Sequence, residues 1–307
     1  MSIWEKIKKP ILALSPMADY TDSPFSLMCK NGGVDLIYRE MVSADAIVHK
    51  SEKTLAMANF DKKECPIILQ IFGSEPDVMA NAAHILEKKY KPDGIDINMG
   101  CPARKIVSDF NGASLMKDYK KAIAIVRAVK KVIKAPLSVK TRLGWDNEEE
   151  ILKFAPILEK AGIDAIAIHG RTKQQGYSGQ ANWDMIGRVK KKLKIPVLVN
   201  GDIIDVASFY SAIKITKADG VLIARGALGR PWIFNNIKDG KDEISKNIKK
   251  IILEHAKLHI KQYGDRGMIT LRKHLIYYVK GMPNAKALRE KLVKVKSLEE
   301  LESILMF

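Results

Sequence analysis

Cysteine is scarce in this chain of 307 residues, which contains only Cys29, Cys65 and Cys101. An odd and sparse set argues against a disulfide framework and favours a reducing compartment. The chain begins with lysines and a short apolar run, but two prolines interrupt that run and Asp19 ends it, so a signal peptide is not expected. No stretch approaches the ~18 apolar residues of a membrane span. We therefore expect a soluble, cytoplasmic protein with no membrane contact and no obligatory protein partner.

Three kinds of chemical motif are also missing. No pair of carboxylates dominates the sequence, which argues against glycoside hydrolysis. Cysteine and histidine do not stand at metal-ligand spacing, so no metal site is predicted. A G-x-G-x-x-G motif does not follow the first apolar run, which disfavours an open dinucleotide-binding sheet.

Acidic residues are few relative to basic ones, 35 against 52, and the net charge is +17. Such an excess favours polyanions such as nucleic acid or acidic membrane surfaces, although a general bias toward lysine would produce the same number. From residue 241 onward the charge is 15 − 8 = +7, against 37 − 27 = +10 for residues 1–240. The shorter part is more than twice as basic per residue, which indicates that it meets an anion.

Eight short apolar runs recur along the first three-quarters of the chain. They span residues 11–16, 35–40, 66–72, 94–100, 136–143, 165–170, 196–201 and 220–225. Their Val, Ile and Leu content is typical of strands buried on both faces. Segments of helical periodicity separate most of them, for example 118–133 and 147–162. The alternation predicts an α/β fold, a parallel (β/α)8 TIM barrel over residues 1–240, with a doubly wound open sheet as the alternative.

After residue 240 the strand signals stop. Residues 241–307 form amphipathic segments separated by 263–267 and 281–284, which predicts a small all-helical domain. Within it, residues 272–280 interleave basic side chains with Tyr277 and Tyr278. This segment is either an RNA-binding surface or a basic helix packed on the barrel.

Polar residues stand where the apolar runs end, and barrel enzymes place their chemistry at the carboxyl ends of strands. These residues are Ser15-Pro16-Met17, Glu40, Gln70, Asn98 with Cys101, Lys140 with Arg142, His169 with Arg171, Asn200-Gly201-Asp202, and Arg225. The glycines after the last two runs, together with Arg225, predict a phosphate site. Lys140 lies inside an apolar strand, where a cation is costly unless an anion pairs with it, or unless the side chain reaches out to solvent.

Six segments at these strand ends resemble tRNA-dihydrouridine synthases, most closely the bacterial B-type subfamily. They are SPMADYTDSPF (15–25), DINMGCPARKIV (96–107), VKTRLGW (139–145), IHGRTKQQGYSG (168–179), VNGDI (199–203) and IARGALGRPWIF (223–234). The likeness continues into LRKHLIYYVKGMP (271–283). It implies FMN-dependent reduction of uridines in tRNA to 5,6-dihydrouridine, with NADPH (or NADH) as the reductant and tRNA as the partner.

The resemblance also implies a role for each matched residue. Cys101 would give a proton to C5 of uracil after hydride from the flavin reaches C6, and a free thiol is mostly protonated at neutral pH. Asn98 would hydrogen-bond the uracil edge. The flavin would be held by Pro16, Met17, Ala18, Gln70, Lys140, His169, Asn200, Gly201, Asp202, Ala224 and Arg225. The RNA would be contacted by Arg104, Lys105, Arg171, Arg272 and Lys273. Cys29 and Cys65 are interpreted as structural.

Two other functions stay open at this point. Dihydroorotate dehydrogenase-like chemistry on a free pyrimidine would use the same barrel and flavin, but the cations after Cys101 and the basic tail favour a polymer. A non-catalytic RNA-binding protein on an enzyme scaffold is the other hypothesis. The presence of every proposed catalytic group disfavours it.

Overall fold

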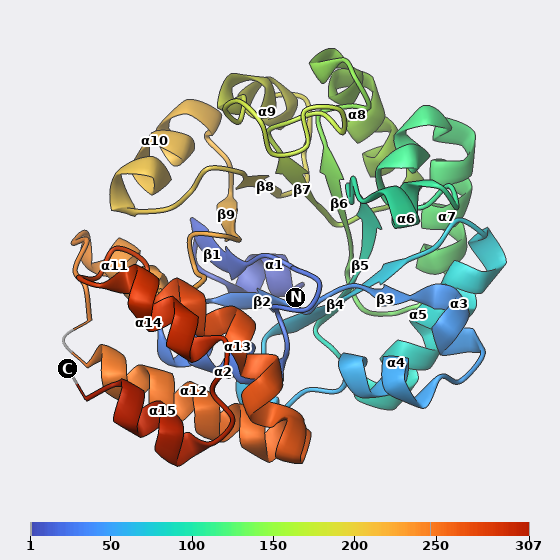
Figure 1. The fold of residues 1–307 in the computed structure, drawn as a ribbon. Helices are drawn as coiled ribbons and strands as arrows, with labels where there is room; N and C mark the ends of the chain where they lie inside the picture. Colours follow the sequence, from blue (N-terminus) through green and yellow to red (C-terminus); the bar gives the residue numbers. More distant parts are fainter. Residues whose placement is uncertain (1, 246, 307) are drawn as a thin grey trace.

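A closed parallel sheet forms the centre of the computed structural model, which describes residues 2–245 and 247–306 (Figure 1). Its strands are β1 (Ile11–Leu14), β2 (Leu36–Tyr38), β3 (Val42–Ser43), β4 (Ile67–Phe72), β5 (Gly94–Met99), β6 (Leu137–Arg142), β7 (Ala165–His169), β8 (Val197–Asn200) and β9 (Gly220–Ile223). The order is β2-β1-β9-β8-β7-β6-β5-β4-β3, and β2 also pairs with β4. Both β2 and β3 pair with β4, so together they fill one of eight barrel positions. The predicted (β/α)8 barrel is confirmed and the open sheet is excluded.

Strand β7 illustrates why these sequences form a barrel. Side chains alternate between the two faces of a strand. Ala165 and Ala167 belong to the cluster inside the barrel, whereas Ile166 and Ile168 belong to the larger core under the helices. Small residues therefore point into the crowded interior and branched ones point outward. Helix α1 (Ile3–Lys6) adds Trp4 to the inner cluster and closes the end of the barrel from which the strands start.

Helices cover the outside of the barrel. They are α2 (Ser23–Asn31), α3 (Ala44–Val48), α4 (Glu52–Ala58), α5 (Pro76–Tyr90), α6 (Arg104–Val107), α7 (Tyr119–Val132), α8 (Ile151–Ala161), α9 (Trp183–Lys190), α10 (Val206–Thr216) and α11 (Ile233–Asp239), with 3-10 turns η1 (Lys62–Glu64), η2 (Gly112–Lys117) and η3 (Glu148–Glu150). The helical segments predicted at 118–133 and 147–162 correspond to α7 and to η3 with α8. Gly162 ends α8 in a left-handed conformation, with φ of 113°.

The chain ends in helices α12 (Ile248–Tyr263), α13 (Gly267–Tyr278), α14 (Ala285–Leu292) and α15 (Leu298–Ile304), with turn η4 (Gly264–Arg266). They share a hydrophobic core of their own that includes Ile252, Leu271, Leu275 and Leu301. Helix α12 packs against α2 of the barrel (Figure 1). The division into two domains at residue 240 stays a prediction. Across residues 2–245 and 247–306, every helix is too short or too polar to cross a membrane.

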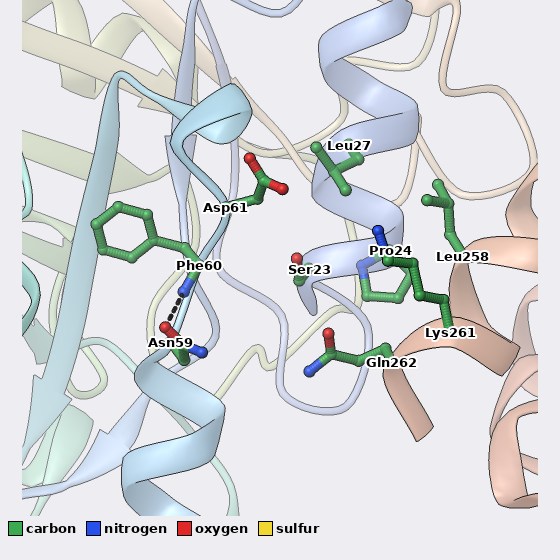
Figure 2. A pocket seen from close by; sticks show the side chains of 9 residues that line it. All are labelled: Ser23, Pro24, Leu27, Asn59, Phe60, Asp61, Leu258, Lys261 and Gln262. Carbon is green, nitrogen blue, oxygen red and sulfur yellow. Dashed lines mark hydrogen bonds between the residues drawn. The ribbon is translucent and has the colours of Figure 1, made fainter. Parts of the chain in front are cut away.

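A small cavity of about 260 Å³ lies where α2 and α12 meet (Figure 2). Its lining consists of Ser23, Pro24, Leu27, Asn59, Phe60, Asp61, Leu258, Lys261 and Gln262. Neither cysteine nor histidine is among these residues, and the Ser23 hydroxyl donates to Glu64 Oε1 at 2.6 Å.

Candidate active site at the carboxyl ends of the strands

A cleft of about 1180 Å³ opens at the carboxyl ends of the barrel strands. Pockets for single small molecules usually measure about 300–1,000 Å³, so this cleft has room for more than one ring system. Its lining includes most of the predicted site residues: Pro16, Met17, Ala18, Gln70, Asn98, Cys101, Arg104, Lys140, His169, Asn200, Gly201, Asp202, Ala224 and Arg225. Four predicted residues lie outside the lining, namely Lys105, Arg171, Arg272 and Lys273.

The loop after β5 holds Cys101 at the rim of this cleft. Asn98 Oδ1 accepts hydrogen bonds from the backbone N–H groups of Gly100 at 3.1 Å and Cys101 at 2.9 Å. The N–H of Ala113 donates to the Cys101 carbonyl at 3.1 Å. Gly112 has φ of 59°, and a Cβ there would lie 2.8 Å from the Cys101 carbonyl oxygen. The loop is therefore fixed from both sides, and its path leaves no room for a side chain at Gly112.

A chain of hydrogen bonds runs below this loop into the barrel. Asn98 Nδ2 donates to Gln70 Oε1 at 2.8 Å, and Gln70 Nε2 donates to Asp96 Oδ2 at 2.7 Å. Ser138 donates to the other carboxylate oxygen of Asp96. Burial raises the pKa of Asp96 to about 6, against the bonds from Ser138 and Gln70, which lower it. Both ends of the Asn98 amide are thus engaged within the protein, so we interpret Asn98 as a residue that positions the Cys101 loop; its predicted contact with uracil stays a prediction.

Lys140 extends from β6 into the cleft, so the alternative in which it reaches solvent outside the barrel is excluded. Its ammonium group makes no hydrogen bond or ion pair with the described residues. Burial, and after it the nearby Arg142, lowers the pKa of Lys140 to about 8, although Asp96 acts in the opposite direction. A lysine in this state is stabilised by an anion placed beside it.

His169 at the end of β7 is neutral. Burial, followed by the charges of Arg142, Lys140 and Arg171, lowers its pKa to about 2. Arg171 Nη1 lies 3.4 Å from His169 Nε2. Because a guanidinium only donates, Nε2 is the acceptor and Nδ1 carries the proton. Gly201, with φ of 110°, must be glycine here, since a Cβ would lie 2.7 Å from Cδ2 of the ring.

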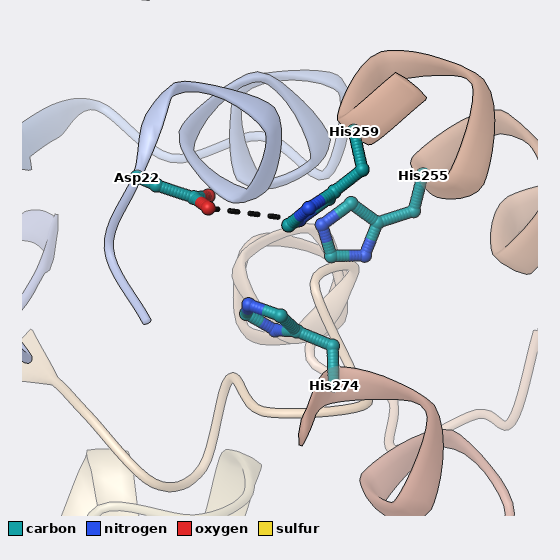
Figure 3. Close-up of side chains that lie close together, drawn as sticks. All are labelled: Asp22, His255, His259 and His274. Atoms are coloured by element: carbon teal, nitrogen blue, oxygen red, sulfur yellow. Dashed lines mark ion pairs between the residues drawn. The ribbon is translucent and has the colours of Figure 1, made fainter. Parts of the chain in front are cut away.

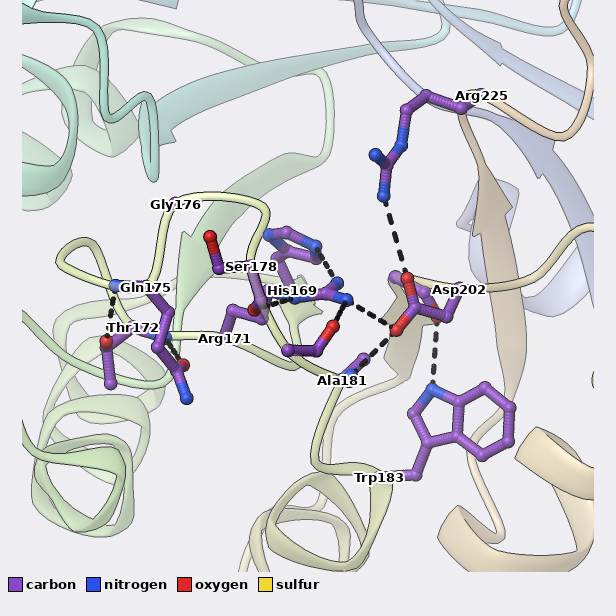
Figure 4. Close-up of polar contacts among 12 residues, drawn as sticks. His169, Arg171, Thr172, Gln175, Gly176, Ser178, Ala181, Trp183, Asp202 and Arg225 are labelled. Carbon is purple, nitrogen blue, oxygen red and sulfur yellow. Dashed lines mark hydrogen bonds and ion pairs between the residues drawn. The ribbon is translucent and has the colours of Figure 1, made fainter.

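The Arg171 guanidinium is engaged in hydrogen bonds within the protein (Figure 4). Its guanidinium donates to Asp202 Oδ2 at 2.6 Å, to the Gly179 carbonyl at 2.6 Å and to the Ser178 carbonyl at 2.9 Å. The side chain is only 2% exposed. This guanidinium is engaged within the protein, and the predicted contact of Arg171 with RNA stays a prediction. The residue ties the segment 172–181 to the end of β8.

The ends of β8 and β9 form a cradle for an anion. Partial burial alone would raise the pKa of Asp202, but the bonds from Arg171 hold it below its usual value. Arg225 lies 3.6 Å from the same carboxylate and is 56% exposed, so its guanidinium also faces the cleft. In the described part of the chain, the backbone N–H groups of Asp202, Arg225 and Gly226 donate no hydrogen bond. Free N–H groups beside a guanidinium are the donors that bind phosphate.

An aromatic wall of the cleft was missed by sequence reasoning. Tyr177 is 62% exposed, and the guanidinium groups of Arg142 and Arg225 lie 5.5 and 5.1 Å from its ring. Tyr20 meets Tyr277 edge to face at 5.9 Å. Burial, and then the Tyr277 hydroxyl, raises the pKa of Tyr20 to about 12. Four tyrosines stand inside the matched motifs, but neither spacing nor periodicity says which of them face the cleft.

The C-terminal helices reach the cleft through Tyr277 and Lys280, which both line it. The two cations predicted to contact RNA from this region lie elsewhere. Arg272 donates to the carbonyls of Val295 at 2.9 Å and Lys294 at 3.0 Å, so its guanidinium holds the loop before α15. Lys273 is partly exposed, and its Nζ lies 5.7 Å from the centre of the Tyr20 ring. The basic segment is thus largely a packed helix, with its last lysine at the cleft.

Arg104 and Lys105 lie on α6, directly after the Cys101 loop. Both side chains are exposed, and Arg104 lines the cleft. Their contact with RNA stays a prediction.

Comparison with known proteins identifies what this arrangement resembles. The family described as "Dihydrouridine synthase (Dus)" matches residues 12–306. The chain is 38% identical over 300 residues to a "Probable tRNA-dihydrouridine synthase 1" of Synechocystis sp., covering 95% of this chain and 84% of that protein. It is 38% identical over 299 residues to "tRNA-dihydrouridine synthase B" of Pseudomonas syringae pv. tomato, covering 94% and 88%.

Solved structures share the barrel at low sequence identity. A 2-naphthoyl-CoA reductase complex superposes with a TM-score of 0.59 at 12% identity, covering 75% of this chain and 50% of that one. Histamine dehydrogenase from Rhizobium sp. 4-9 gives 0.58 at 12% identity, covering 80% and 48%. These likenesses support the fold alone.

Proposed function

Because this chain belongs to the dihydrouridine synthase family, we propose that it reduces uridines of transfer RNA to 5,6-dihydrouridine, with FMN as its cofactor and NADPH as its reductant. One observation supports the assignment of this reaction to particular residues. The thiol-bearing loop after β5 and the anion cradle after β8 and β9 open into the same cleft. That cleft is large enough for a flavin and a pyrimidine together.

The residues present fit a flavin mononucleotide. Its phosphate would accept from the free N–H groups of Asp202, Arg225 and Gly226 and from the Arg225 guanidinium. The protonated Lys140 would lie beside the ring and favour negative charge there, which accounts for a cation that has no partner among the described residues. When bound and reduced, FMN supplies the hydride that adds to C6 of uracil.

Cys101 completes the reaction on the other face of the base. Addition of hydride at C6 leaves a pair of electrons at C5, and the Cys101 thiol protonates that carbon. The thiolate that remains regains a proton from water, so the net change at the base is the gain of two electrons and two protons. Asn98 and Gly112 hold the loop that aims the sulfur. General acids of this kind contribute about 10²- to 10⁴-fold to a rate.

The basic surface next to the cleft supports a polymeric substrate. Arg104 and Lys280 line the cleft and Lys105 follows directly, so phosphates of an RNA strand have cations at its entrance. A base within folded RNA must be turned out of its stack to reach such a site. The tyrosines of the wall offer surfaces on which flanking bases can stack.

The test is a reaction of the purified full chain, loaded with FMN, with NADPH and unmodified tRNA transcripts. Dihydrouridine is measured by mass spectrometry of the digested RNA. We expect Cys101→Ala to lose dihydrouridine formation by about 100-fold or more, while NADPH still bleaches the flavin absorbance and tRNA still binds. Cys65→Ala, at the opposite end of the barrel, is the matched control. Equal product from the Cys101 variant would remove the acid role, and turnover of free orotate but not tRNA would replace the substrate.

A further inference from the structure

Four buried side chains with metal-ligating atoms meet where the C-terminal helices pack on the barrel (Figure 3). Asp22 precedes α2, His255 and His259 lie one turn apart on α12, and His274 comes from α13. Their ligand atoms all lie within 4.8 Å of one another. The three histidines are 0% exposed and Asp22 is 4% exposed. None of the four lines the cleft, so the group is separate from the candidate active site.

Hydrogen bonding within the described residues does not account for these rings. Neither nitrogen of His274 has a partner, and Nε2 of both His255 and His259 also lacks one. A buried polar atom without a partner costs about 1–3 kcal/mol. One nitrogen of each ring and a carboxylate oxygen of Asp22 lie within 4.8 Å of one another, so a cation among them would bind one nitrogen per ring.

His259 is oriented so that its Nε2 faces the carboxylate of Asp22. The Thr270 hydroxyl donates its one hydrogen to the Gly267 carbonyl at 3.0 Å. His259 Nδ1 lies 3.1 Å from that hydroxyl and must therefore be the donor between them. Nε2 on the other side of the ring then faces Asp22 Oδ2, which lies 3.6 Å away.

The spacing suits a transition metal. Zinc bonds to nitrogen and oxygen at about 2.0–2.2 Å, so in a tetrahedral site the donor atoms lie about 3.4 Å apart. The 3.6 Å between His259 and Asp22 is close to this value. The remaining donors need only small side-chain rotations from separations within 4.8 Å.

Further groups orient the donors, as is usual around bound metals. Tyr278 Oη lies 3.0 Å from His255 Nδ1, which leaves Nε2 of that ring for the centre. Tyr263 donates to Asp22 Oδ2 at 3.0 Å, and the Phe25 N–H donates to the other oxygen at 3.0 Å. Each ligand except His274 is thus held by a partner outside the group.

We propose that Asp22, His255, His259 and His274 bind a divalent transition metal, zinc in the first place, which fixes the C-terminal helices to the barrel. Three imidazoles and one carboxylate form a closed set of four ligands, the arrangement of a structural zinc site. Sequence reasoning predicted no metal. The i, i+4 spacing of His255 and His259 was the only local sign, because the other two ligands stand far away in the sequence.

The site also supports the wall of the cleft. The His274 ring contacts Tyr20 edge to face at 5.3 Å, and Tyr20 in turn contacts Tyr277. A metal that holds His274 therefore limits the movement of both tyrosines.

The test is the metal content of the full chain, purified without a histidine tag from zinc-supplemented medium and measured by inductively coupled plasma mass spectrometry. We expect about one equivalent of zinc per chain. His259→Gln and His274→Gln should each reduce the bound metal at least tenfold, whereas His49→Gln, which changes an exposed histidine, should leave it unchanged. Asp22→Asn retains an oxygen for the Phe25 N–H and serves where the histidine variants fail to fold.

A second measurement does not depend on metal acquired during growth. Chelator-treated protein should have a lower melting temperature, and Zn²⁺ but not Mg²⁺ should restore it. One equivalent of iron or manganese would support the site with a different metal. Metal below a tenth of an equivalent after reconstitution, with no rise in melting temperature, would overturn the proposal. None of these readouts uses turnover, so they are independent of the proposed reaction.

Discussion

Lys140 shows how one position in a strand can become part of a functional site. Strand β6 is largely buried, and the alternation of side chains turns Lys140, like Arg142 two residues further on, toward the cleft. Burial weakens its hold on a proton, while an anionic group beside it would strengthen that hold. The residue is thus suited to sense the charge of whatever occupies the cleft.

Replacing Lys140 by Gln should lower the reduction potential of bound FMN, because the reduced ring loses a neighbouring positive charge. We expect a decrease of about 30 mV, equivalent to about 1.4 kcal/mol for two electrons. In the protein alone the pKa of Lys140 is lowered to about 8, and an anionic reduced ring beside it would raise that pKa, so the charge is present at pH 7 and is lost only at a pH above 8. The difference between native protein and variant should therefore shrink above pH 8. Dye-equilibrated potentials from pH 6.5 to 9.5 measure this.

Lys105→Gln, which changes an exposed residue outside the cleft, is the control for that experiment. Its potential should follow the native curve. Identical curves for Lys140→Gln and the native chain would show that Lys140 does not act on the cofactor.

A methyl group added at Gly201 tests how closely the anion cradle packs against His169. Alanine there would bring Cβ within 2.7 Å of the His169 ring, in addition to backbone strain at φ of 110°. We expect Gly201→Ala to lower the free energy of unfolding by about 1–3 kcal/mol and to reduce the FMN that co-purifies. Gly176→Ala is the matched control, because φ is 58° there but no atom lies within 4 Å of the added Cβ. Thermal denaturation and flavin absorbance of both variants separate the steric clash with His169 from the backbone strain at positive φ. Equal loss of flavin in both variants would show that the clash with His169 is not the cause.

At the scale of elements, Arg171 ties the end of the segment 172–181 to Asp202, whereas Arg142 donates to the carbonyls of Thr172 and Gly176 nearer its start. Arg171→Met would remove the hydrogen bonds to Ser178, Gly179 and Asp202 and leave that carboxylate without its buried partner. We expect faster hydrogen exchange of amides in this segment and a loss of about 2–3 kcal/mol in the free energy of unfolding. Exchange mass spectrometry on native and variant chains checks this.

Arg188→Met is the control for the buried pair. Arg188 forms an exposed ion pair with Glu149 at 3.1 Å, and such pairs contribute about 0–1 kcal/mol. If both variants exchange and unfold alike, Arg171 does not hold the segment.

Elements that repeat a simple rule could be predicted from the sequence. The alternation in β7 and the apolar stripe of α7 follow from strand and helix periods, and together they gave the barrel. The short strand β3 could not be predicted, because the run 35–40 covers β2 alone and β3 depends on pairing with β4.

The site was predictable where it follows strand ends and unpredictable where it depends on distant partners. Cys101, Lys140 and Arg225 all open into the cleft because the carboxyl ends of parallel strands meet there. Arg171 and Arg272 carry the same guanidinium group as Arg225. Their guanidinium groups, however, donate to backbone carbonyls elsewhere in the chain, those of Gly179 and Val295. No pattern along the chain distinguishes an arginine that faces solvent from one that ties a loop.

For the whole molecule, the net charge of +17 attracts RNA over long range. The cations around the cleft then determine where on the surface the RNA binds. Lys105 follows the Cys101 loop on the carboxyl side of the barrel. Lys194 is equally exposed but precedes β8, on the opposite side. The two lysines add the same charge to the whole molecule, so only their positions differ.

We therefore expect Lys105→Gln to weaken tRNA binding more than Lys194→Gln does, at equal net charge. A lysine that neutralises a phosphate releases a counterion, so its loss should reduce the slope of log Kd against log salt concentration by about 1. A lysine that contributes only to the overall field should leave that slope nearly unchanged, because salt screens exposed charges beyond about 10 Å at 0.1 M. Fluorescence-detected titrations of tRNA at 50–300 mM salt give both slopes. Equal slopes would place the RNA-binding surface away from the mouth of the barrel, and with it the route by which a uridine reaches Cys101.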